Sequence, residues 1–171
     1  MTLDRGRDPE VRKRSGYAHE GSLLASDKTV LVVFLVVLLA VRLFLMIWLP
    51  FTDTTEARYA EIARKMVETG DWITPQFDYG VPVWGTPPLL SWAAALGMKL
   101  FGVGPFGARI FILAAALGVL GLMLNWVAEW RSRDVGLVAV AVCGSSLLFF
   151  GASAFVMTDM VMVLGTTLAM I

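Results

Sequence analysis

Two carboxylates, Asp53 and Glu56, lie three residues apart, just beyond a long apolar run. A carboxylate at such a place can accept a proton from a hydroxyl group and act as a general base. The same D-x-x-E spacing suits a capping box at a helix N-terminus, with Asp53 as the N-cap residue. Spacing alone favours the cap. The two roles are compatible, so the sequence leaves both open.

A third carboxylate, Asp159, directly precedes the last apolar run. Ionisable residues at a membrane edge are functional candidates, although an N-cap is the simpler interpretation of Asp159. Arg42 lies inside the first apolar run, roughly 10 Å by helical rise from its outer end. It must therefore snorkel outward or pair with Asp53, Glu56 or a lipid phosphate.

Arg58 and Arg109 are the other cations that flank these apolar runs on the same side. A guanidinium group suits a phosphate because its fork donates two hydrogen bonds at once, so either residue could hold a lipid phosphate. The simpler interpretation makes Arg58 part of a solvated helix face and Arg109 an interfacial anchor at the start of an apolar run. Spacing favours the simpler interpretation for both.

The composition indicates a membrane protein. Of the 171 residues, 57% are hydrophobic and 16% are charged, and the mean hydropathy is +0.72. The 14 Lys and Arg residues balance the 14 Asp and Glu residues, so the chain has no net positive charge to attract nucleic acid, and we exclude that class of partner.

The sequence offers little for metal or cofactor chemistry. A single cysteine, Cys143, and a single histidine, His19, exclude an internal disulfide and a cysteine-based zinc site. A metal would have only carboxylates to bind it, and we predict none. No phosphate-binding loop, dinucleotide fingerprint or nucleophile elbow occurs, and we predict no cofactor.

The apolar runs predict an all-α integral membrane protein that follows a flexible cytoplasmic tail at residues 1–28. We expect about four transmembrane helices, the last incomplete, at residues 30–49, 106–126, 135–156 and 160–171. Basic residues cluster before the first run and between the second and third, which places those segments in the cytoplasm. The outer loop, residues 50–105, and the turn at 151–159 then share the opposite face.

The outer loop is expected to be ordered, because long structureless connections are uncommon. Apolar residues at helical spacing predict an amphipathic helix over residues 54–68, with Gly70 at its end. A second helix is predicted over 87–101, with Thr86 as a possible N-cap. Both are interpreted as helices at the membrane surface, joined by a loop that anchors itself at the headgroups through Trp72, Trp84 and Trp92.

Taken in order, the strings EARYAEI, GDWITP, PPLLSW and FGAR, followed by VMTDM, resemble polyprenyl-phosphate-sugar-dependent glycosyltransferases of the GT-C class. This group contains the lipid A aminoarabinose transferases and the protein O-mannosyltransferases. The resemblance covers about residue 30 to the end of the chain. It implies the N-terminal portion of a GT-C fold, whose two surface helices are that fold's juxtamembrane helices.

The resemblance also implies an activity. Such enzymes transfer a sugar from a polyprenyl-phosphate carrier to a lipid or protein acceptor on the extracytoplasmic face, with inversion at the anomeric carbon. It also implies that the protein lies in a bacterial inner membrane. In this resemblance, Asp53 and Glu56 correspond to the candidates for the catalytic base. It puts Arg58 and Asp159 beside the donor, with Arg42 and Arg109 as further phosphate candidates.

Family members run to several hundred residues, so we expect this chain to be a fragment that is inactive alone. Two other classes of protein are alternative interpretations of this sequence. A small membrane scaffold or subunit would explain the spans but not an ordered outer segment with clustered carboxylates. A transporter fragment would concentrate ionisable residues near the bilayer midplane, where only Arg42 comes close.

Overall fold

The structure, a computed structural model, describes residues 24–83 and 88–170. The predictions for the tail before residue 24, for Trp84 and for a cap at Thr86 lie outside these residues. The described part is helical apart from one short β-hairpin. This agrees with the all-α fold that the composition predicts.

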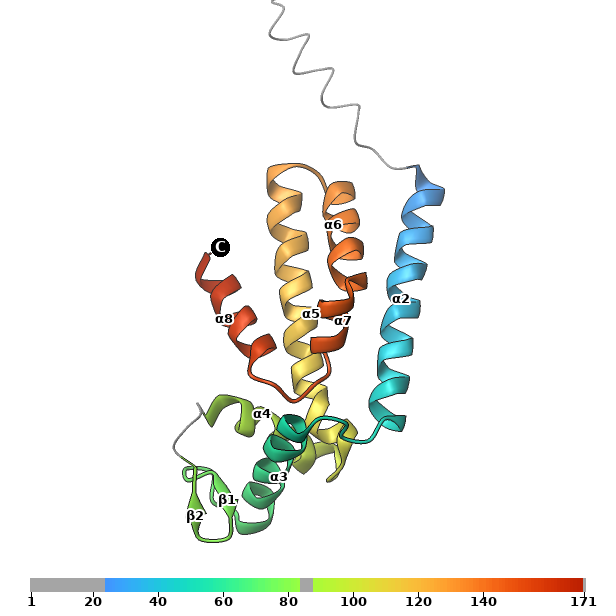
Figure 1. The fold of residues 1–171 in the computed structure, drawn as a ribbon. Coiled ribbons are helices and arrows are strands. Elements are labelled where there is room, and N and C mark those ends of the chain that lie inside the picture. Colours follow the sequence, from blue (N-terminus) through green and yellow to red (C-terminus); the bar gives the residue numbers. More distant parts are fainter. Residues whose placement is uncertain (1–23, 84–87, 171) are drawn as a thin grey trace, which may run out of the picture.

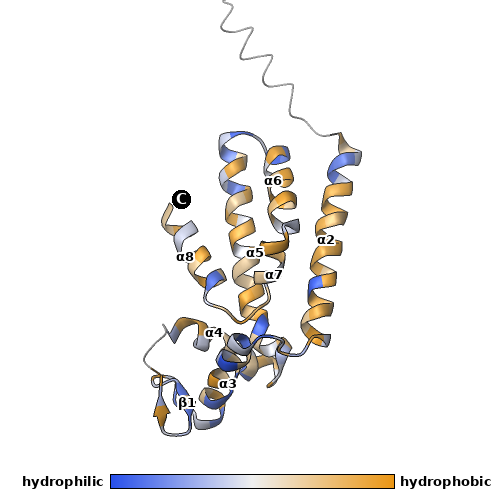
Figure 2. Ribbon diagram, in the orientation of Figure 1, coloured by the Kyte–Doolittle hydropathy of each residue, from blue (hydrophilic) through white to orange (hydrophobic). Residues whose placement is uncertain are grey.

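Helices α2 (Ala25–Trp48), α5 (Pro105–Trp130) and α6 (Arg133–Ser145) stand side by side (Figure 1). Within the described residues, α2 and α5 are the two helices long and apolar enough to cross a membrane, with 24 and 26 residues. Figure 2 shows that the residues along both helices are predominantly hydrophobic. Helix α2 begins before the predicted residue 30, and an ion pair of 2.8 Å from Lys28 Nζ to Asp134 Oδ1 ties its start to the start of α6.

The apolar run at 135–156, predicted as one continuous span, is instead broken. Helix α6 ends at Ser145, and a short helix, α7 (Leu147–Ala152), follows after Ser146. Ser146 has extended backbone angles, its hydroxyl donates to Cys143 O at 2.8 Å, and its Oγ accepts from Phe149 N at 3.4 Å. These local hydrogen bonds compete with a continuous helix, which is why apolar composition alone misses the break.

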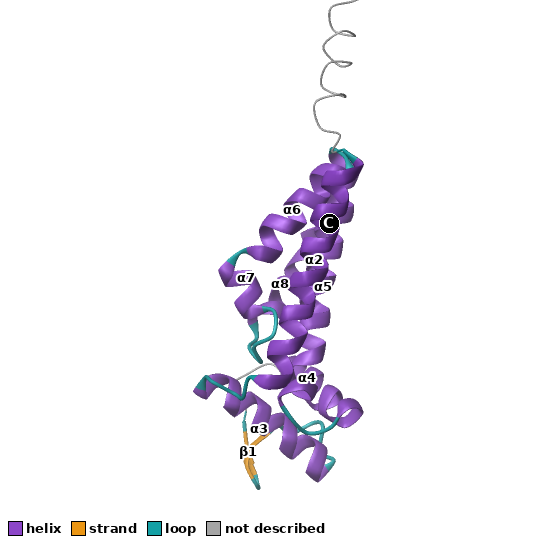
Figure 3. Ribbon diagram, turned by 90° about the vertical axis from the view of Figure 1, so that its right-hand side faces the viewer, coloured by secondary structure: helices purple, strands orange, loops and turns teal. Residues whose placement is uncertain are grey.

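The remaining apolar run forms α8 (Asp159–Met170), which packs against α5. Turns at residues 153–158 connect α7 to α8. These turns lie at the same end of the molecule as the segment that follows α2, as Figures 1 and 3 show. The two segments therefore lie at one end of the molecule, and their location on the extracytoplasmic face stays a prediction.

In the parts of the predicted outer loop that the structure describes, residues 50–83 and 88–105, the chain forms helices α3 (Thr54–Thr69) and α4 (Pro88–Phe101), close to the predicted ranges 54–68 and 87–101. Gly70 ends α3 with φ 72°, in the left-handed region that glycine adopts readily. Between the helices, β1 (Gln76–Asp78) and β2 (Val81–Pro82) pair antiparallel. The hairpin was not predicted, because the Gly- and Pro-rich stretch is too short to show strand periodicity.

Helix α4 turns back onto α5 through a very close contact between glycines. Gly102 makes the turn with φ 96°. A Cβ atom on Gly97 would lie 2.1 Å from Gly107 O, and one on Gly107 would lie 2.3 Å from Gly102 O. No side chain larger than hydrogen fits at Gly97 or Gly107 without a shift of the backbone, so these small residues permit the close approach of α4 and α5.

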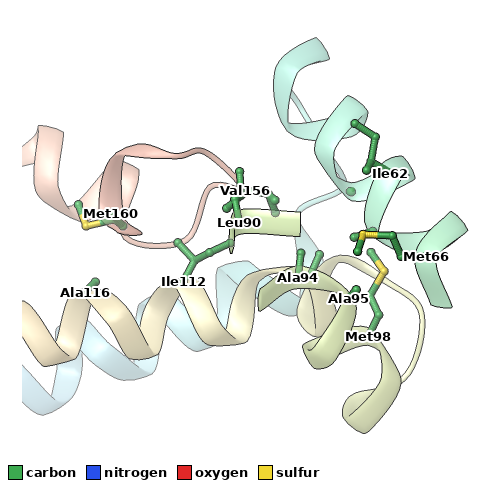
Figure 4. Close-up of a cluster of buried hydrophobic side chains, with 13 residues drawn as sticks. Ile62, Met66, Leu90, Ala94, Ala95, Met98, Ile112, Ala116, Val156 and Met160 are labelled. Atoms are coloured by element: carbon green, nitrogen blue, oxygen red, sulfur yellow. The ribbon is translucent and has the colours of Figure 1, made fainter. Parts of the chain in front are cut away.

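The main hydrophobic core lies where α3, α4 and α5 meet the turn before α8 (Figure 4). Ile62 and Met66 contribute the buried face of α3, each 1% exposed, and Ile112 contributes that of α5 at 0%. Burial of one such side chain stabilises the fold by about 1.5–3 kcal/mol. This core holds α3 against the upright helices and so fixes the position of its N-terminus.

Candidate functional site

The predicted site carboxylates lie where α2 passes into α3 and where the chain passes from α7 to α8: Asp53, Glu56 and Asp159. We call this region, residues 49–56 together with 153–159, the loop junction. Its two segments are joined directly, because the Val156 backbone N–H donates to Glu56 Oε1 at 3.3 Å. Residues about a hundred positions apart in sequence thus meet in one place.

Asp53 is the N-cap of α3, as its spacing predicts. Its Oδ2 accepts a hydrogen bond from Thr55 N at 3.2 Å, and its carbonyl oxygen accepts from Ala57 N at 2.9 Å. The side chain is half-buried. The carboxylate thus receives a hydrogen bond from the first turn of α3 through Oδ2.

Glu56 does not complete a capping box. It is 0% exposed, and its two oxygens accept from the Arg109 guanidinium, Oε1 from Nε at 2.7 Å and Oε2 from Nη2 at 2.8 Å. Such a bidentate pair is the strongest geometry that a carboxylate and an arginine can form. Glu56 is therefore engaged inside the protein in this structure and is not presented to a substrate.

Arg109 is likewise internal, at 2% exposed. Besides Glu56, it donates from Nη1 to Leu49 O at 2.7 Å and from Nη2 to Pro50 O at 3.1 Å. The ring of Phe51 lies 5.3 Å from its guanidinium carbon. Each of the three Arg109 nitrogens therefore donates to the protein in this structure, so the guanidinium is engaged with Glu56 and the backbone after α2.

Arg42 is 8% exposed and pairs with neither Asp53 nor Glu56. Its Nη2 donates to Gly151 O at 2.5 Å, and the rings of Phe150 and Phe155 lie 5.1 and 5.8 Å from the guanidinium carbon. Its Nε has no hydrogen-bond partner within the described residues. Arg42 also lines an apolar cavity of about 280 Å³ between α2, α5, α6 and α7.

Arg58 and Asp159 are both exposed. Arg58 lies on the outward face of α3, where its guanidinium carbon is 6.0 Å from the centroid of the Phe77 ring. Asp159 is the first residue of α8. The structure therefore brings Glu56 and Arg109 into contact, holds Asp53 and Asp159 at the two segments of the loop junction, and leaves Arg58 on the surface.

The β-hairpin is tied to α3 by charged side chains. Lys65, 5% exposed, donates to Phe77 O at 2.8 Å and to Asp78 Oδ1 at 3.1 Å. The Lys65 ammonium, together with the backbone N–H of Tyr79, lowers the pKa of the Asp78 carboxyl. A hydrogen bond to Glu68 raises the pKa of the Tyr79 hydroxyl. These groups hold the hairpin and take no part in the loop junction.

The contact between Glu56 and Arg109 is the feature that the sequence interpretation missed. Glu56 lies three residues before Tyr59 and seven before Ala63, so it falls on the apolar face of α3 and not on the solvated one. An arginine within or beside an apolar run is expected to pair with an acidic side chain or with backbone carbonyls. Those two observations together make Glu56 a candidate partner for Arg42 or Arg109, and only the fold decides between the two.

Comparison with known proteins relates this geometry to a family. Residues 28–171 match the sequence profile described as dolichyl-phosphate-mannose-protein mannosyltransferase. The chain is 34% identical over 124 residues to a protein of Aeromonas hydrophila and 33% identical over 129 residues to one of Sodalis glossinidius. Both are named undecaprenyl phosphate-alpha-4-amino-4-deoxy-L-arabinose arabinosyl transferases, the second with the suffix 2. These alignments cover 71% and 74% of this chain but 22% of each relative, so the chain spans about a fifth of their length.

The fold is also similar to one solved structure, that of ArnT from Cupriavidus metallidurans in the apo state. The TM-score is 0.69 at 24% sequence identity, over 84% of this chain and 26% of that one. At this identity the similarity concerns the fold. The arrangement of upright helices above α3 and α4 is therefore shared with part of a much longer protein.

Proposed function

This chain belongs to the dolichyl-phosphate-mannose-protein mannosyltransferase family, as its sequence resemblance predicts, and on that premise we propose that it forms part of a membrane glycosyltransferase. The proposed reaction moves a sugar from a polyprenyl-phosphate carrier to a lipid or protein acceptor. The names of the bacterial relatives support a polyprenyl-phosphate-linked donor. We further propose that the chain is inactive without the rest of such an enzyme, since it spans about a fifth of those relatives.

Asp53 is the proposed general base. Its carboxylate accepts the proton of an acceptor hydroxyl while the hydroxyl oxygen attacks the anomeric carbon of the sugar. The bond from that carbon to the carrier phosphate breaks on the opposite face, so the configuration inverts and polyprenyl phosphate leaves. The observation that carries this assignment is the exposure of the side chain: Asp53 is half-buried at the start of α3, whereas Glu56 is 0% exposed and ion-paired.

The donor phosphate needs a cation that is not already engaged. Arg58 is the leading candidate, because it is exposed on α3 within two turns of Asp53 and its guanidinium can donate two hydrogen bonds to a phosphate. Arg42 is the second candidate, since it lies beside an apolar cavity that suits an isoprenoid chain. Asp159 is proposed to contact the sugar or the acceptor from the other segment of the loop junction.

The site is proposed to face outward from a bacterial inner membrane. Basic residues precede α2 and lie in the connection between α5 and α6, and such residues are retained in the cytoplasm. The loop junction is at the other end of these helices (Figure 1). A soluble nucleotide sugar is therefore not required, because the lipid carrier supplies the sugar on that side.

The experiment that tests the proposal compares wild type with Asp53→Asn in the full-length gene product. Labelled sugar on a polyprenyl phosphate is offered with membrane lipid and protein acceptors, and transferred label is counted. Asn keeps the N-cap, so folding should persist while transfer falls by about 10²–10⁴-fold, the usual contribution of a general base.

Two results would count against the proposal. Full turnover in Asp53→Asn would reduce Asp53 to a helix cap. No transfer by folded wild type from any carrier-linked donor would favour a scaffold or a transporter fragment. Thr55→Ser, which leaves the Asp53 carboxylate in place, is the matched control and should retain activity.

A further inference from the structure

The Glu56–Arg109 pair joins three separate segments of the chain at the loop junction. We propose that Arg109 is a positioning residue that sets the place of the catalytic carboxylate, with Glu56 as its partner and not as a second base. This inference rests on the proposed function of Asp53. It gives the two buried residues a role that their sequence positions do not indicate.

The first step concerns the connection between α2 and α3. Arg109 Nη1 and Nη2 donate to the carbonyl oxygens of Leu49 and Pro50, which directly follow α2. Four residues after Leu49, the chain is held again, where Asp53 accepts from Thr55 N and Ala57 N. Both ends of this short connection are therefore fixed by hydrogen bonds. The backbone that carries the Asp53 side chain has little freedom to move.

The second step concerns the turn before α8. Glu56 Oε1 accepts from Val156 N, three residues before Asp159. The same carboxylate that holds Arg109 thus also holds the segment that carries the second predicted site residue. Movement of Arg109 would be transmitted to both carboxylates, because the pair connects both segments of the loop junction.

The third step concerns why an arginine, and not a lysine, is needed at position 109 to hold both segments of the loop junction. Arg109 donates from three nitrogens in a planar fork, to two carboxylate oxygens and two carbonyl oxygens. A lysine in its place would keep the charge but would offer one nitrogen, which cannot reach all four acceptors. The Arg109→Lys change therefore removes the geometry of the contact while it retains its charge.

The expected effect is on the chemical step. A displacement of about 1 Å in a catalytic group can reduce the rate about 10²-fold. In full-length protein, Arg109→Lys should reduce kcat by about 10- to 100-fold and leave KM for the polyprenyl-phosphate donor within about twofold. Arg64→Lys is the matched control, because Arg64 pairs with Glu61 and Glu68 on the exposed face of α3.

A second readout does not depend on activity. A nitroxide label on Thr52→Cys, an exposed position in the α2–α3 connection, is introduced after Cys143→Ser and removal of any other cysteine. Its electron paramagnetic resonance spectrum should sharpen in Arg109→Lys, since the connection loses its anchor, and should be unchanged in Arg64→Lys. If Arg109→Lys does not accumulate, Phe51→Leu, which removes the ring beside the guanidinium, should give the same changes at a smaller size.

The outcomes separate this inference from the proposed function. A mobile label together with a lower kcat supports the positioning role. An unchanged label, or a kcat equal to that of Arg64→Lys, overturns it. If folded wild type transfers no sugar, the proposed function fails, while the label still decides whether Arg109 anchors the connection.

Discussion

The close contact between α4 and α5 makes a sharp prediction about two glycines. Replacement of Gly97 by alanine would place a Cβ atom 2.1 Å from Gly107 O, and atoms of this kind do not approach below about 3.0 Å. The two helices would have to separate by about 1 Å, since the obstructing atom is backbone and cannot rotate away. Overpacking of this kind costs about 1–3 kcal/mol.

Alanine also favours a helix over glycine by about 0.5–1 kcal/mol, which offsets part of that cost. We therefore expect Gly97→Ala to lower the free energy of unfolding by about 1–2 kcal/mol. Gly107→Ala should cost a similar amount, because its Cβ would lie 2.3 Å from Gly102 O. Since α4 carries part of the core that supports α3, transfer activity should decline as well.

The assay is equilibrium unfolding of full-length protein in mixed detergent micelles, with Gly121→Ala as the matched control. Gly121 lies in α5, and among the described residues no atom of another element lies within 4 Å of the place that a Cβ atom would take. Its replacement should therefore be neutral or stabilising by at most about 1 kcal/mol. Equal stabilities of Gly97→Ala and Gly121→Ala would refute the reasoning, because both changes would then show only the gain in helix propensity that they share and no cost from the contact at Gly97.

Two further predictions concern α3 and the hairpin. Met66→Ala, at a site 1% exposed in the main core, should cost about 2–5 kcal/mol in the same unfolding assay, whereas Ile73→Ala, at a site 85% exposed, should stay within about 0.5 kcal/mol. The pKa of Asp78 is lowered by Lys65, so its contribution to stability is present above the unfolded value of about 3.9 and is lost as the pH falls through the lower folded value. Amide exchange in residues 76–82 should therefore accelerate relative to that in α5 at acidic pH. An Asp78→Asn variant should show this faster exchange already at neutral pH. Equal protection of the hairpin amides in wild type and Asp78→Asn at neutral pH would contradict this account.

Much of the fold follows from the sequence because its signals are local. The places of α2 and α5 in the chain follow from uninterrupted apolar runs, although α2 begins before its run and α5 extends beyond its own. Helix α3 follows from apolar residues at helical spacing between the Asp53 cap and Gly70. The order of these helices places the loop junction at one end. Break points inside apolar runs are less visible, and Ser146 divides the third run through side-chain hydrogen bonds that hydropathy does not register.

In the candidate site too, properties that depend on neighbouring residues follow from the sequence, and contacts between distant residues do not. The sequence by itself determined that Asp53 begins α3 and that Arg42 and Arg109 are cations within or beside apolar runs, since these properties depend only on neighbouring residues. Only the tertiary structure decided which carboxylate is engaged inside the protein and which is left at the surface. Glu56 and Arg109 are 53 positions apart and meet only after α3 packs against α5, and that burial makes an ion pair obligatory for both. Asp53, three residues earlier, is the N-cap with extended backbone angles, so it precedes the first turn of α3 and stays half-buried.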